Sequence, residues 1–517
     1  DVIGRPPLPS SDSPEAYGLI NRWMGDCLAK HDACKKTLSG ATIDDALPPI
    51  LPRRIIHVGR PNEAISPRLI ETHGETSHYV ALSHCLGHPT DNPPLTTTQT
   101  TLESHVSNVS FDSLPKAYQD AIVATHRLGF EYIWIDSLCI IRDSDADRFY
   151  NLSCKGTVFQ SARLVIAASH ATNNTEPCFF QRSALPPDIE LQHVSRAGKP
   201  EGSVFAGLRP NDNASLLPEC SPLATYSNAT EELLLSRRII FYTPSSLIWS
   251  CKQINQRETG NSFHSTSRNP VWRVLVEKHT ARRFPNPGDR LTSLEEVRSE
   301  LGKRRTDSVY CFGLWQNEMP LCLLWYCLKP ARRAKSGIRP PTWTWASTTC
   351  SILFINMGGI AQAPNECRGL RFDESSKTLA FSGVIKRIPR YAPTTEHPRW
   401  DKATAEEVLA TLETLHGYPL DDQKGYILDD DGAVIGWAFL DEPDAPNIGL
   451  RCVRVMRKTL TKHNTMGAVK RKLYRDWILL LSGSEDDFGR FQRLGVGVLT
   501  TVERWFEDEA ATQIYLG

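Results

Sequence analysis

The most informative stretch of the sequence is residues 113–169, SLPKAYQDAIVATHRLGFEYIWIDSLCIIRDSDADRFYNLSCKGTVFQSARLVIAAS. Apolar residues at helical spacing predict a helix over 114–128, with Ser113 as its N-terminal cap and Gly129 at its end. The runs 132–135 and 163–169 are almost continuously apolar, which is typical of strands buried on both faces. We therefore expect this stretch to form the centre of a sheet with helices against it.

Three aspartates, Asp143, Asp145 and Asp147, precede a second helix that we expect over 147–160. Carboxylate oxygens suit a hard cation, but the spacing lacks the glycine and the glutamate of a calcium-binding loop. Capping of the positive end of the helix is the favoured interpretation. With a further strand over 78–83, strands and helices alternate along 78–169, and this order predicts a parallel α/β layer.

Composition excludes several classes of protein. The chain has 517 residues, of which 40 % are apolar, and its 59 lysines and arginines balance 59 aspartates and glutamates. A net charge of zero gives no reason to expect nucleic acid or a membrane surface as a partner. The 14 cysteines are scattered, and the opening residues lack a basic start followed by an apolar run. We expect buried free thiols and a cytoplasmic location.

The composition and the apolar pattern of the sequence change along the chain, and these changes suggest four parts. We expect an N-terminal lead packed on the core (1–77), an α/β core (78–182), a polar, proline-rich connecting insertion (183–260) and a large α+β C-terminal portion (261–517). In that last portion, apolar periodicity predicts helices and strands; the helices are expected near 271–279 and 294–301, and the strands near 378–384, 433–439, 477–481 and 495–500.

Several blocks of this core resemble the fungal heterokaryon-incompatibility (HET) domain. They are YVALSHCLG at 79–87, LPK at 114–116, YIWIDSLCI at 132–140, GTVF at 156–159 and IAA at 166–168. The resemblance implies a cytosolic fungal protein whose core has been likened to the TIR fold, a flavodoxin-like α/β domain. It also implies either a link to non-self recognition and programmed cell death or, as for some HET-like proteins, service as an enzyme of a natural-product pathway.

The sequence departs from the HET pattern at two places. The first block usually ends in Trp-Gly, whereas here it ends in Leu86-Gly87. The third block usually begins Asp-Trp with a glutamate a few residues later; here Arg148 follows Asp147, and Asn151 stands in place of the glutamate. Some TIR domains cleave NAD with a helix glutamate, and an amide cannot ionise to replace it. The departure therefore disfavours an NAD hydrolase.

Polar side chains follow two of the expected strands. His84 and Cys85 come after the first, and Asp136, Ser137 and Cys139 come after the next. Parallel sheets place ligand sites at the carboxyl ends of strands, so these side chains are expected to converge beside a concave pocket. His84 with Asp136 would form an oriented acid–base pair, and a cysteine could act as nucleophile. The alternative is core packing for the cysteines and turn capping for Asp136.

Two further patterns are weaker. Cys27, His31 and Cys34 would share one face of a helix expected over 16–33, but a fourth zinc ligand would have to come from a distant part of the chain. Packing is favoured, so we expect no metal and no cofactor. Trp343 and Trp345 alternate at strand spacing, and core packing is favoured over a wall that stacks a ligand.

The function expected first is an enzyme on a small molecule, such as a cyclase, isomerase or hydrolase, with an acid–base site near His84 and Asp136. The alternative is an incompatibility or cell-death signalling protein without catalysis. That alternative predicts an exposed apolar patch suited to self-association, and so a homo-oligomer. An NAD hydrolase is the least favoured class, because of Asn151.

Overall fold

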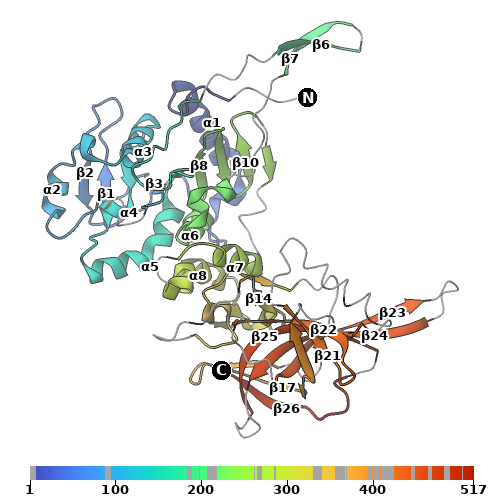
Figure 1. Ribbon diagram of the computed structural model, residues 1–517. Helices are drawn as coiled ribbons and strands as arrows, with labels where there is room; N and C mark the ends of the chain where they lie inside the picture. Colours follow the sequence, from blue (N-terminus) through green and yellow to red (C-terminus); the bar gives the residue numbers. More distant parts are fainter. Residues whose placement is uncertain are drawn as a thin grey trace. The chain divides into compact units, whose positions relative to one another are not determined.

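The computed structural model divides into two compact units (Figure 1). The first comprises Asp1–Pro270, Arg282–Pro285 and Thr292–Arg304, and the second comprises Val271–Ala281, Asn286–Leu291 and Arg305–Gly517. The structure describes residues 7–87, 95–182, 189–196, 198–206, 218–260, 262–264, 271–284, 287–329, 333, 340–355, 367, 369–393, 399–400, 404, 408, 424–443, 449–463, 469–482, 489–502 and 505–517.

The first unit alternates helices and strands, as the sequence predicts. Its helices are α1 (Pro14–Lys30), α2 (Leu102–Ser107), α3 (Lys116–Arg127), α4 (Asp136–Cys139), α5 (Asp145–Ser161), α6 (Ala229–Leu235) and α8 (Glu295–Gly302). Its strands are β1 (Arg54–His57), β2 (Arg68–Glu71), β3 (Val80–Ser83), β4 (Tyr132–Trp134), β5 (Leu164–Ala167), β6 (Ile189–Val194), β7 (Pro200–Ala206), β8 (Arg238–Tyr242), β9 (Leu247–Cys251), β10 (Ile254–Arg257) and β11 (Ser262–His264).

Nine of these strands form one mixed sheet, in the order β11-β10-β9-β8-β5-β3-β4-β1-β2. At its centre, β3 pairs parallel with both β4 and β5, and β5 pairs parallel with β8. The strands on either side pair antiparallel. The expected parallel layer is therefore correct for the centre and wrong for the flanks, because hairpins such as β8–β9 extend the sheet without a crossover helix.

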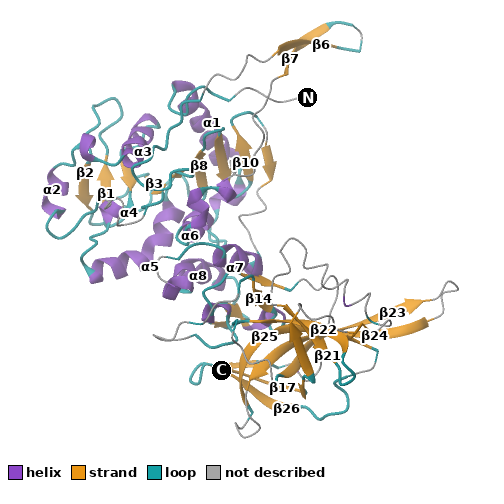
Figure 2. Ribbon diagram, in the orientation of Figure 1, coloured by secondary structure: helices purple, strands orange, loops and turns teal. Residues whose placement is uncertain are grey.

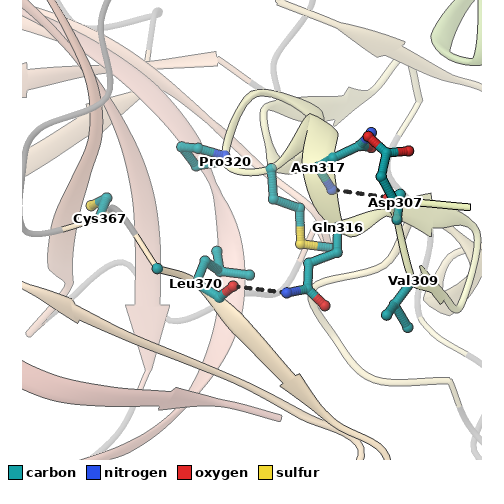
Figure 3. A pocket seen from close by; sticks show the side chains of 10 residues that line it. Asp307, Val309, Gln316, Asn317, Pro320, Cys367 and Leu370 are labelled. Atoms are coloured by element: carbon teal, nitrogen blue, oxygen red, sulfur yellow. Dashed lines mark hydrogen bonds between the residues drawn. The ribbon is translucent and has the colours of Figure 1, made fainter. Parts of the chain in front are cut away.

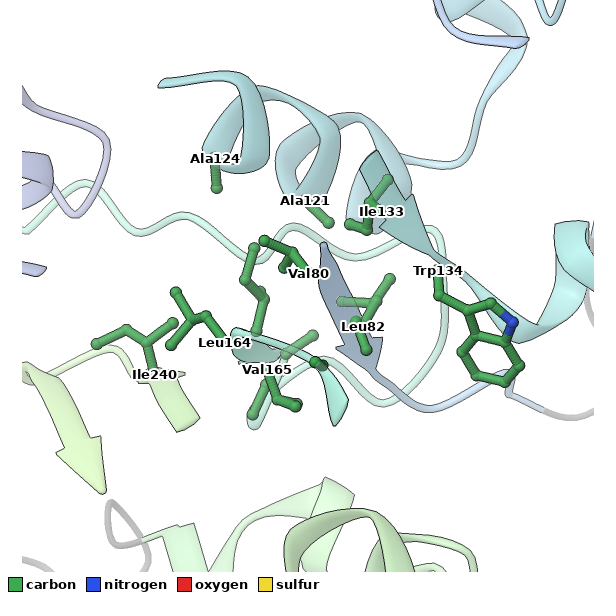
Figure 4. Packing of buried hydrophobic residues seen from close by; sticks show 14 of the residues in the cluster. Val80, Leu82, Ala121, Ala124, Ile133, Trp134, Leu164, Val165 and Ile240 are labelled. Atoms are coloured by element: carbon green, nitrogen blue, oxygen red, sulfur yellow. The ribbon is translucent and has the colours of Figure 1, made fainter. Parts of the chain in front are cut away.

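Helices cover the central strands. Ala121 and Ala124 of α3 face the sheet on one side (Figure 4), where their small side chains allow close approach. Trp134 of β4 points away from α3 and meets Phe159 of α5 edge to face, with ring centroids 5.6 Å apart. The central strands are buried along their whole length, which explains why they read as continuous apolar runs.

Two glycines of this unit are required by close packing. At Gly87, where φ is +83°, a Cβ atom would lie 2.6 Å from Cβ of Asn173. At Gly156 of α5, a Cβ atom would lie 2.6 Å from Leu235 of α6 and 2.7 Å from Glu296 of α8. Any side chain at Gly156 would therefore push these three helices apart.

Helix caps differ in detail from the sequence analysis. Pro115 occupies the cap position of α3, and Ser113 donates its hydroxyl to the carbonyl of Ser110 instead. Ser144 is the side-chain cap of α5, accepting the amide of Asp147 at 3.3 Å. The prediction of Ser113 as a cap is wrong because Pro115 disfavours a helical conformation at Leu114, so the cap lies at the proline, two residues beyond the serine.

The N-terminal helix packs on the antiparallel side of the sheet. Trp23 of α1 lies against Trp249 of β9, with ring centroids 6.3 Å apart. The helix ends at Lys30, earlier than expected, and His31 leads into a short 3-10 helix, Asp32–Lys35. Part of the predicted connecting insertion, residues 183–188, 197 and 207–217, lies outside the described residues. The boundaries inferred from sequence at 77, 182 and 260 stay predictions.

The second unit is rich in strands (Figure 2). Long antiparallel strands β23, β24 and β25 run side by side, and β22 pairs with β25. The helix is α7 (Trp272–Thr280), and the strands are β12 (Tyr310–Cys311), β13 (Leu314–Trp315), β14 (Trp325–Cys327), β15 (Ile352–Phe354), β16 (Arg371–Asp373), β17 (Thr378–Gly383), β18 (Ile385–Arg387), β19 (Arg390–Pro393), β20 (Arg399–Trp400), β21 (Lys424–Leu428), β22 (Ala433–Leu440), β23 (Arg451–His463), β24 (Val469–Ser482), β25 (Arg490–Thr501) and β26 (Thr512–Leu516).

Buried tryptophans form much of the interior of the second unit. Trp343 and Trp345 are completely buried, so core packing is confirmed for both. Their expected strand is wrong, because Trp345 begins a 3-10 helix, Trp345–Ser347, capped by the Thr344 hydroxyl. Across the part of the chain that the structure describes, no helix combines the length and the apolar character that crossing a bilayer requires.

Candidate functional site

The sheet brings the two polar motifs together. His84 follows β3, and Asp136 begins α4 immediately after β4. Because β3 and β4 are parallel neighbours, both residues lie at the same edge of the sheet. Nε2 of His84 is 3.9 Å from Oδ1 of Asp136. The expected convergence at the carboxyl ends of two adjacent strands is thus present.

A chain of hydrogen bonds connects the two residues. Nε2 of His84 lies 3.1 Å from the Tyr118 hydroxyl. Tyr118 donates to the Ser137 hydroxyl at 2.8 Å, and Ser137 donates to Oδ1 of Asp136 at 3.1 Å. Since the tyrosine proton is used on Ser137, the network assigns the donated proton of His84 to Nε2. Nδ1 of the neutral ring then carries the lone pair that can accept a proton.

Charge fixes the protonation of the pair. Burial lowers the pKa of His84, although the carboxylate of Asp136 acts in the opposite direction. For Asp136, burial alone would raise the pKa, but Arg142 and His84 reverse the effect and hold it below its usual range. Nη2 of Arg142 lies 3.1 Å from Oδ2 of Asp136. At neutral pH the site therefore contains a neutral imidazole beside an ionised carboxylate.

A second ion pair adjoins these groups. Nζ of Lys155 on α5 is 2.5 Å from Oε1 of Glu232 on α6, and both side chains are about nine-tenths buried. Ser83, at the end of β3, donates its hydroxyl to Oε2 of Glu232 at 2.6 Å. Burial opposes the charge of Lys155, but Glu232 and Asp136 outweigh it and raise the pKa of the amine. The site thus combines two cations with two carboxylates.

The two candidate cysteine nucleophiles are poorly suited to that role. Cys85 and Cys139 are each only 1 % exposed. Burial raises the pKa of each thiol to about 12. Because the thiolate is the reactive form, both side chains stay unreactive thiols at neutral pH. Acid–base chemistry at His84 and Asp136 is the chemistry that the geometry favours.

Two buried polar groups near the site lack hydrogen-bond partners among the described residues. One is Nε of Arg142, and the other is the side-chain amide of Asn174. Asn174 lies close enough to the Tyr118 hydroxyl to influence its pKa, but the two do not form a hydrogen bond of good geometry. Unsatisfied buried groups are costly, so they often mark positions that a ligand or water completes.

The position expected for the HET glutamate has a structural role. Asp147 binds the buried guanidinium of Arg54 and accepts the amide of Ile141 at 2.8 Å. Asn151 donates to the carbonyl of Asp147 at 2.8 Å and to its carboxylate at 3.2 Å. The Asn151 amide therefore donates hydrogen bonds to Asp147, the carboxylate partner of the buried Arg54. Of the three aspartates, Asp145 and Asp147 lie in the first turn of α5, at its positive end, where Ser144 is the side-chain cap. Asp143 lies before the helix and accepts the amide of Gln99 at 2.8 Å.

Four members of the site were not predicted from the sequence: Tyr118, Arg142, Lys155 and Glu232. Lys155 lies on the buried face of α5 near Val158 and Phe159, where a lysine needs a partner. Tyr118 lies on the apolar face of α3, where a hydroxyl also calls for a partner. Glu232 is 149 residues from Ser83, and no local pattern connects them.

Possible metal ligands gather at another place in the first unit. Cys27, His31 and Cys34, for which the sequence favoured packing without a metal, are joined by Cys251 at the end of β9. The four ligand atoms all lie within 4.8 Å of one another. The distant fourth ligand that the sequence could not supply is thus Cys251.

The second unit contains a pocket of about 350 Å³ (Figure 3). Gln316 donates to the carbonyl of Leu370 at 3.2 Å across it, and the amide of Asn317 donates to the Ser308 hydroxyl. Among the lining residues Asp307 carries a formal charge, and the hydrogen bonds at the cavity join uncharged groups. We therefore place no chemistry there.

Comparison with known proteins gives one match. Residues 79–233 match the family described as heterokaryon incompatibility protein (HET). No curated protein and no solved structure matches the chain. The matched range begins at the strand that leads to His84 and ends just beyond Glu232, so it includes His84, Tyr118, Asp136, Lys155 and Glu232. The chain therefore contains a domain of the heterokaryon incompatibility (HET) family, which spans residues 79–233.

Proposed function

We propose that the HET domain of this protein is an enzyme that performs acid–base chemistry on a small molecule. The observation that carries the proposal is the hydrogen-bonded chain from His84 through Tyr118 and Ser137 to Asp136. A neutral imidazole held by a buried network and backed by a carboxylate is the arrangement that general-base catalysis uses. The unsatisfied Nε of Arg142 and amide of Asn174 support a ligand position beside it.

His84 is the proposed proton acceptor. When Nδ1 takes a proton from the substrate, the Asp136 carboxylate 3.9 Å away stabilises the imidazolium that forms. The hydrogen bonds through Tyr118 and Ser137 fix the ring, and Nδ1 of the imidazolium returns its proton to the product. Such a site suits isomerisation, cyclisation or hydrolysis, in which a proton is removed at one atom and delivered at another. The free cysteines support a reducing, cytoplasmic location.

Mass spectrometry with a fungal metabolite extract, to which NAD is added, tests this proposal. We expect the native protein to retain or convert a small molecule and to leave NAD intact. His84→Ala and Asp136→Asn should lower turnover by about 10²–10⁴-fold, the usual contribution of a general base. Because burial lowers the pKa of His84, activity should persist below pH 6.5 and fall only when the ring becomes protonated.

His73→Ala is the matched control, because His73 is exposed and takes no part in the network. It should leave turnover unchanged, and circular dichroism should report the same fold for all variants. Full turnover by folded His84→Ala would contradict the enzyme proposal. So would a native protein that neither binds nor converts any metabolite. Consumption of NAD would instead favour the hydrolase that Asn151 argues against.

A second candidate, signalling by self-association, is supported by an exposed apolar patch on α5. Phe149 is 76 % exposed and Leu152 is 69 % exposed, and their i, i+3 spacing puts them on one face of the helix. Tyr150 beside them is 46 % exposed. Exposed apolar clusters of this kind suit an interface between two copies of the chain.

Light scattering across a range of protein concentrations tests this second candidate. We expect a concentration-dependent rise in mass that Phe149→Ser combined with Leu152→Ser abolishes, because the substitutions remove apolar area from the interface. Leu47→Ser, which changes another exposed leucine, should leave the association intact. A native protein that stays monomeric at every concentration would rule the candidate out.

A further inference from the structure

Four side chains from distant parts of the first unit form a compact, buried cluster. Cys27 lies near the end of α1, His31 caps that helix, Cys34 lies in the following 3-10 helix, and Cys251 ends β9. All four residues are buried, and the three cysteines have no exposed surface. Sγ of Cys251 is 3.4 Å from Nδ1 of His31. Residues 220 positions apart thus place their donor atoms at one point.

The dimensions of the cluster suit a tetrahedral metal ion. Zinc binds sulfur at about 2.3 Å and imidazole nitrogen at about 2.0–2.1 Å. Ligand atoms at the corners of such a tetrahedron are about 3.3–3.8 Å apart, by the geometry of those bond lengths. The four donor atoms here are all within 4.8 Å of one another before any ion draws them together. Three sulfurs and one imidazole are a ligand set of structural zinc sites.

We propose that Cys27, His31, Cys34 and Cys251 bind a structural zinc ion. The four protein ligands complete the tetrahedron and leave no open position, so the ion would stabilise the fold and would take no part in catalysis. It would join the end of α1 to the end of β9, and so fix the N-terminal helix on the sheet of the first unit.

The groups around the sulfur atoms are hydrogen-bond donors that would stabilise deprotonated cysteines. Nε of Arg238, a completely buried residue, lies 3.3 Å from Sγ of Cys27. The amide of Ile254 donates to Sγ of Cys251 at 3.4 Å. A divalent cation with three thiolates carries one net negative charge, which a buried guanidinium offsets. Hydrogen bonds from outer residues to the ligands are typical of metal sites, and Asp45 in turn holds Arg238.

Two other states of the cluster, a disulfide and neutral thiols, explain the arrangement of its side chains less completely than a bound zinc ion does. A disulfide between two of the cysteines would leave the third sulfur and His31 without a reason to converge. Packing as neutral thiols would place three weak donors around an imidazole and would give Nε of Arg238 only a neutral sulfur as acceptor. A bound cation accounts for all four side chains and for Arg238.

Metal analysis of the full chain tests the proposal directly. The protein would be expressed in zinc-supplemented medium, purified without chelator and analysed by inductively coupled plasma mass spectrometry. We expect about one zinc per chain, as for a closed four-ligand site. Cys251→Ser should reduce the zinc content severalfold and lower the Tm. Cys178→Ser, which changes a buried cysteine of the same unit outside the cluster, should keep the zinc.

A second measurement covers the case in which Cys251→Ser fails to fold. Native protein treated with chelator and then titrated with Co²⁺ should develop the intense visible absorption of tetrahedral cobalt bound to thiolates, and zinc should displace it. Native protein free of zinc that develops no such absorption would overturn the proposal. So would a disulfide within the cluster, detected by mass spectrometry of peptides from unreduced protein, or iron in place of zinc.

Discussion

Asp45→Asn is expected to reduce the free energy of unfolding by about 3–5 kcal/mol, the cost of leaving buried charges without their partner. Three arginines surround this carboxylate: Arg238 at 2.5 Å, Arg237 at 2.7 Å and Arg163 at 3.2 Å. Arg237 and Arg238 have almost no exposed surface. An amide at position 45 keeps the shape of the side chain but leaves three guanidinium groups facing one another.

Urea unfolding of the native chain and the variant, followed by tryptophan fluorescence, measures the loss. Asp145→Asn is the control, because its side chain is 92 % exposed and its pair with Arg148 should contribute under about 1 kcal/mol. A loss for Asp45→Asn no larger than that of the control would contradict the expected role of Asp45.

The effect of Asp45 also has a defined pH dependence. Burial alone would raise its pKa, but Arg238 and Arg237 outweigh burial and lower it. The stabilising contribution is therefore complete above the unfolded-state pKa of about 3.9 and is lost as the pH falls through the lower folded-state pKa. The difference between native chain and variant should be large at pH 7 and should shrink below about pH 4, near the unfolded-state pKa.

In the second unit, Arg493→Met is expected to cost about 3–5 kcal/mol for the same physical reason. Arg493 is completely buried, and its Nε lies 2.9 Å from Oδ2 of Asp441. It also donates to the carbonyls of Leu323 and Trp325, and its guanidinium carbon is 3.4 Å from the centre of the Trp325 ring. Methionine fills similar space but leaves a carboxylate and two carbonyls without these donors.

Urea unfolding again measures the change, with Arg490→Met as control. Arg490 lies on the same strand, β25, but is exposed, so its replacement should change stability by less than about 0.5 kcal/mol. Adding Asp441→Leu to Arg493→Met should recover part of the loss, since the double variant no longer buries a carboxylate that has lost Arg493 and keeps Arg333 at 3.0 Å. If the double variant recovers no stability, the loss in Arg493→Met comes mainly from the hydrogen bonds to the two carbonyls and the contact with the Trp325 ring.

Local sequence patterns predicted the centre of the first unit well. The apolar runs around Val80, Ile133 and Val165 became β3, β4 and β5, because strands buried on both faces must be apolar along their length. The positions of His84 and Asp136 after two such strands were enough to predict that they meet. The antiparallel flanks were missed, because whether a following strand returns as a hairpin depends on long-range pairing.

The remainder of the site depends on tertiary structure that leaves little local signal. Glu232 reaches Ser83 and Lys155 only because α6 packs beside α5, where Gly156 permits close approach. Arg142 was not distinguishable from any surface arginine until its bond to Asp136 was visible. The same limit applied to Cys251, which completes a cluster whose other members are close in sequence.

The contact between the N-terminal helix and β9 has a consequence for the order of events at the ribosome. Cys251 emerges from the exit tunnel 220 residues after His31, which at about 5–20 residues per second is a delay of about 10–45 s. During that time Trp23 and the apolar face of α1 have no sheet edge to cover them. The nascent chain therefore exposes the apolar face of α1 until β9 has emerged, and α1 reaches its final place only after that strand.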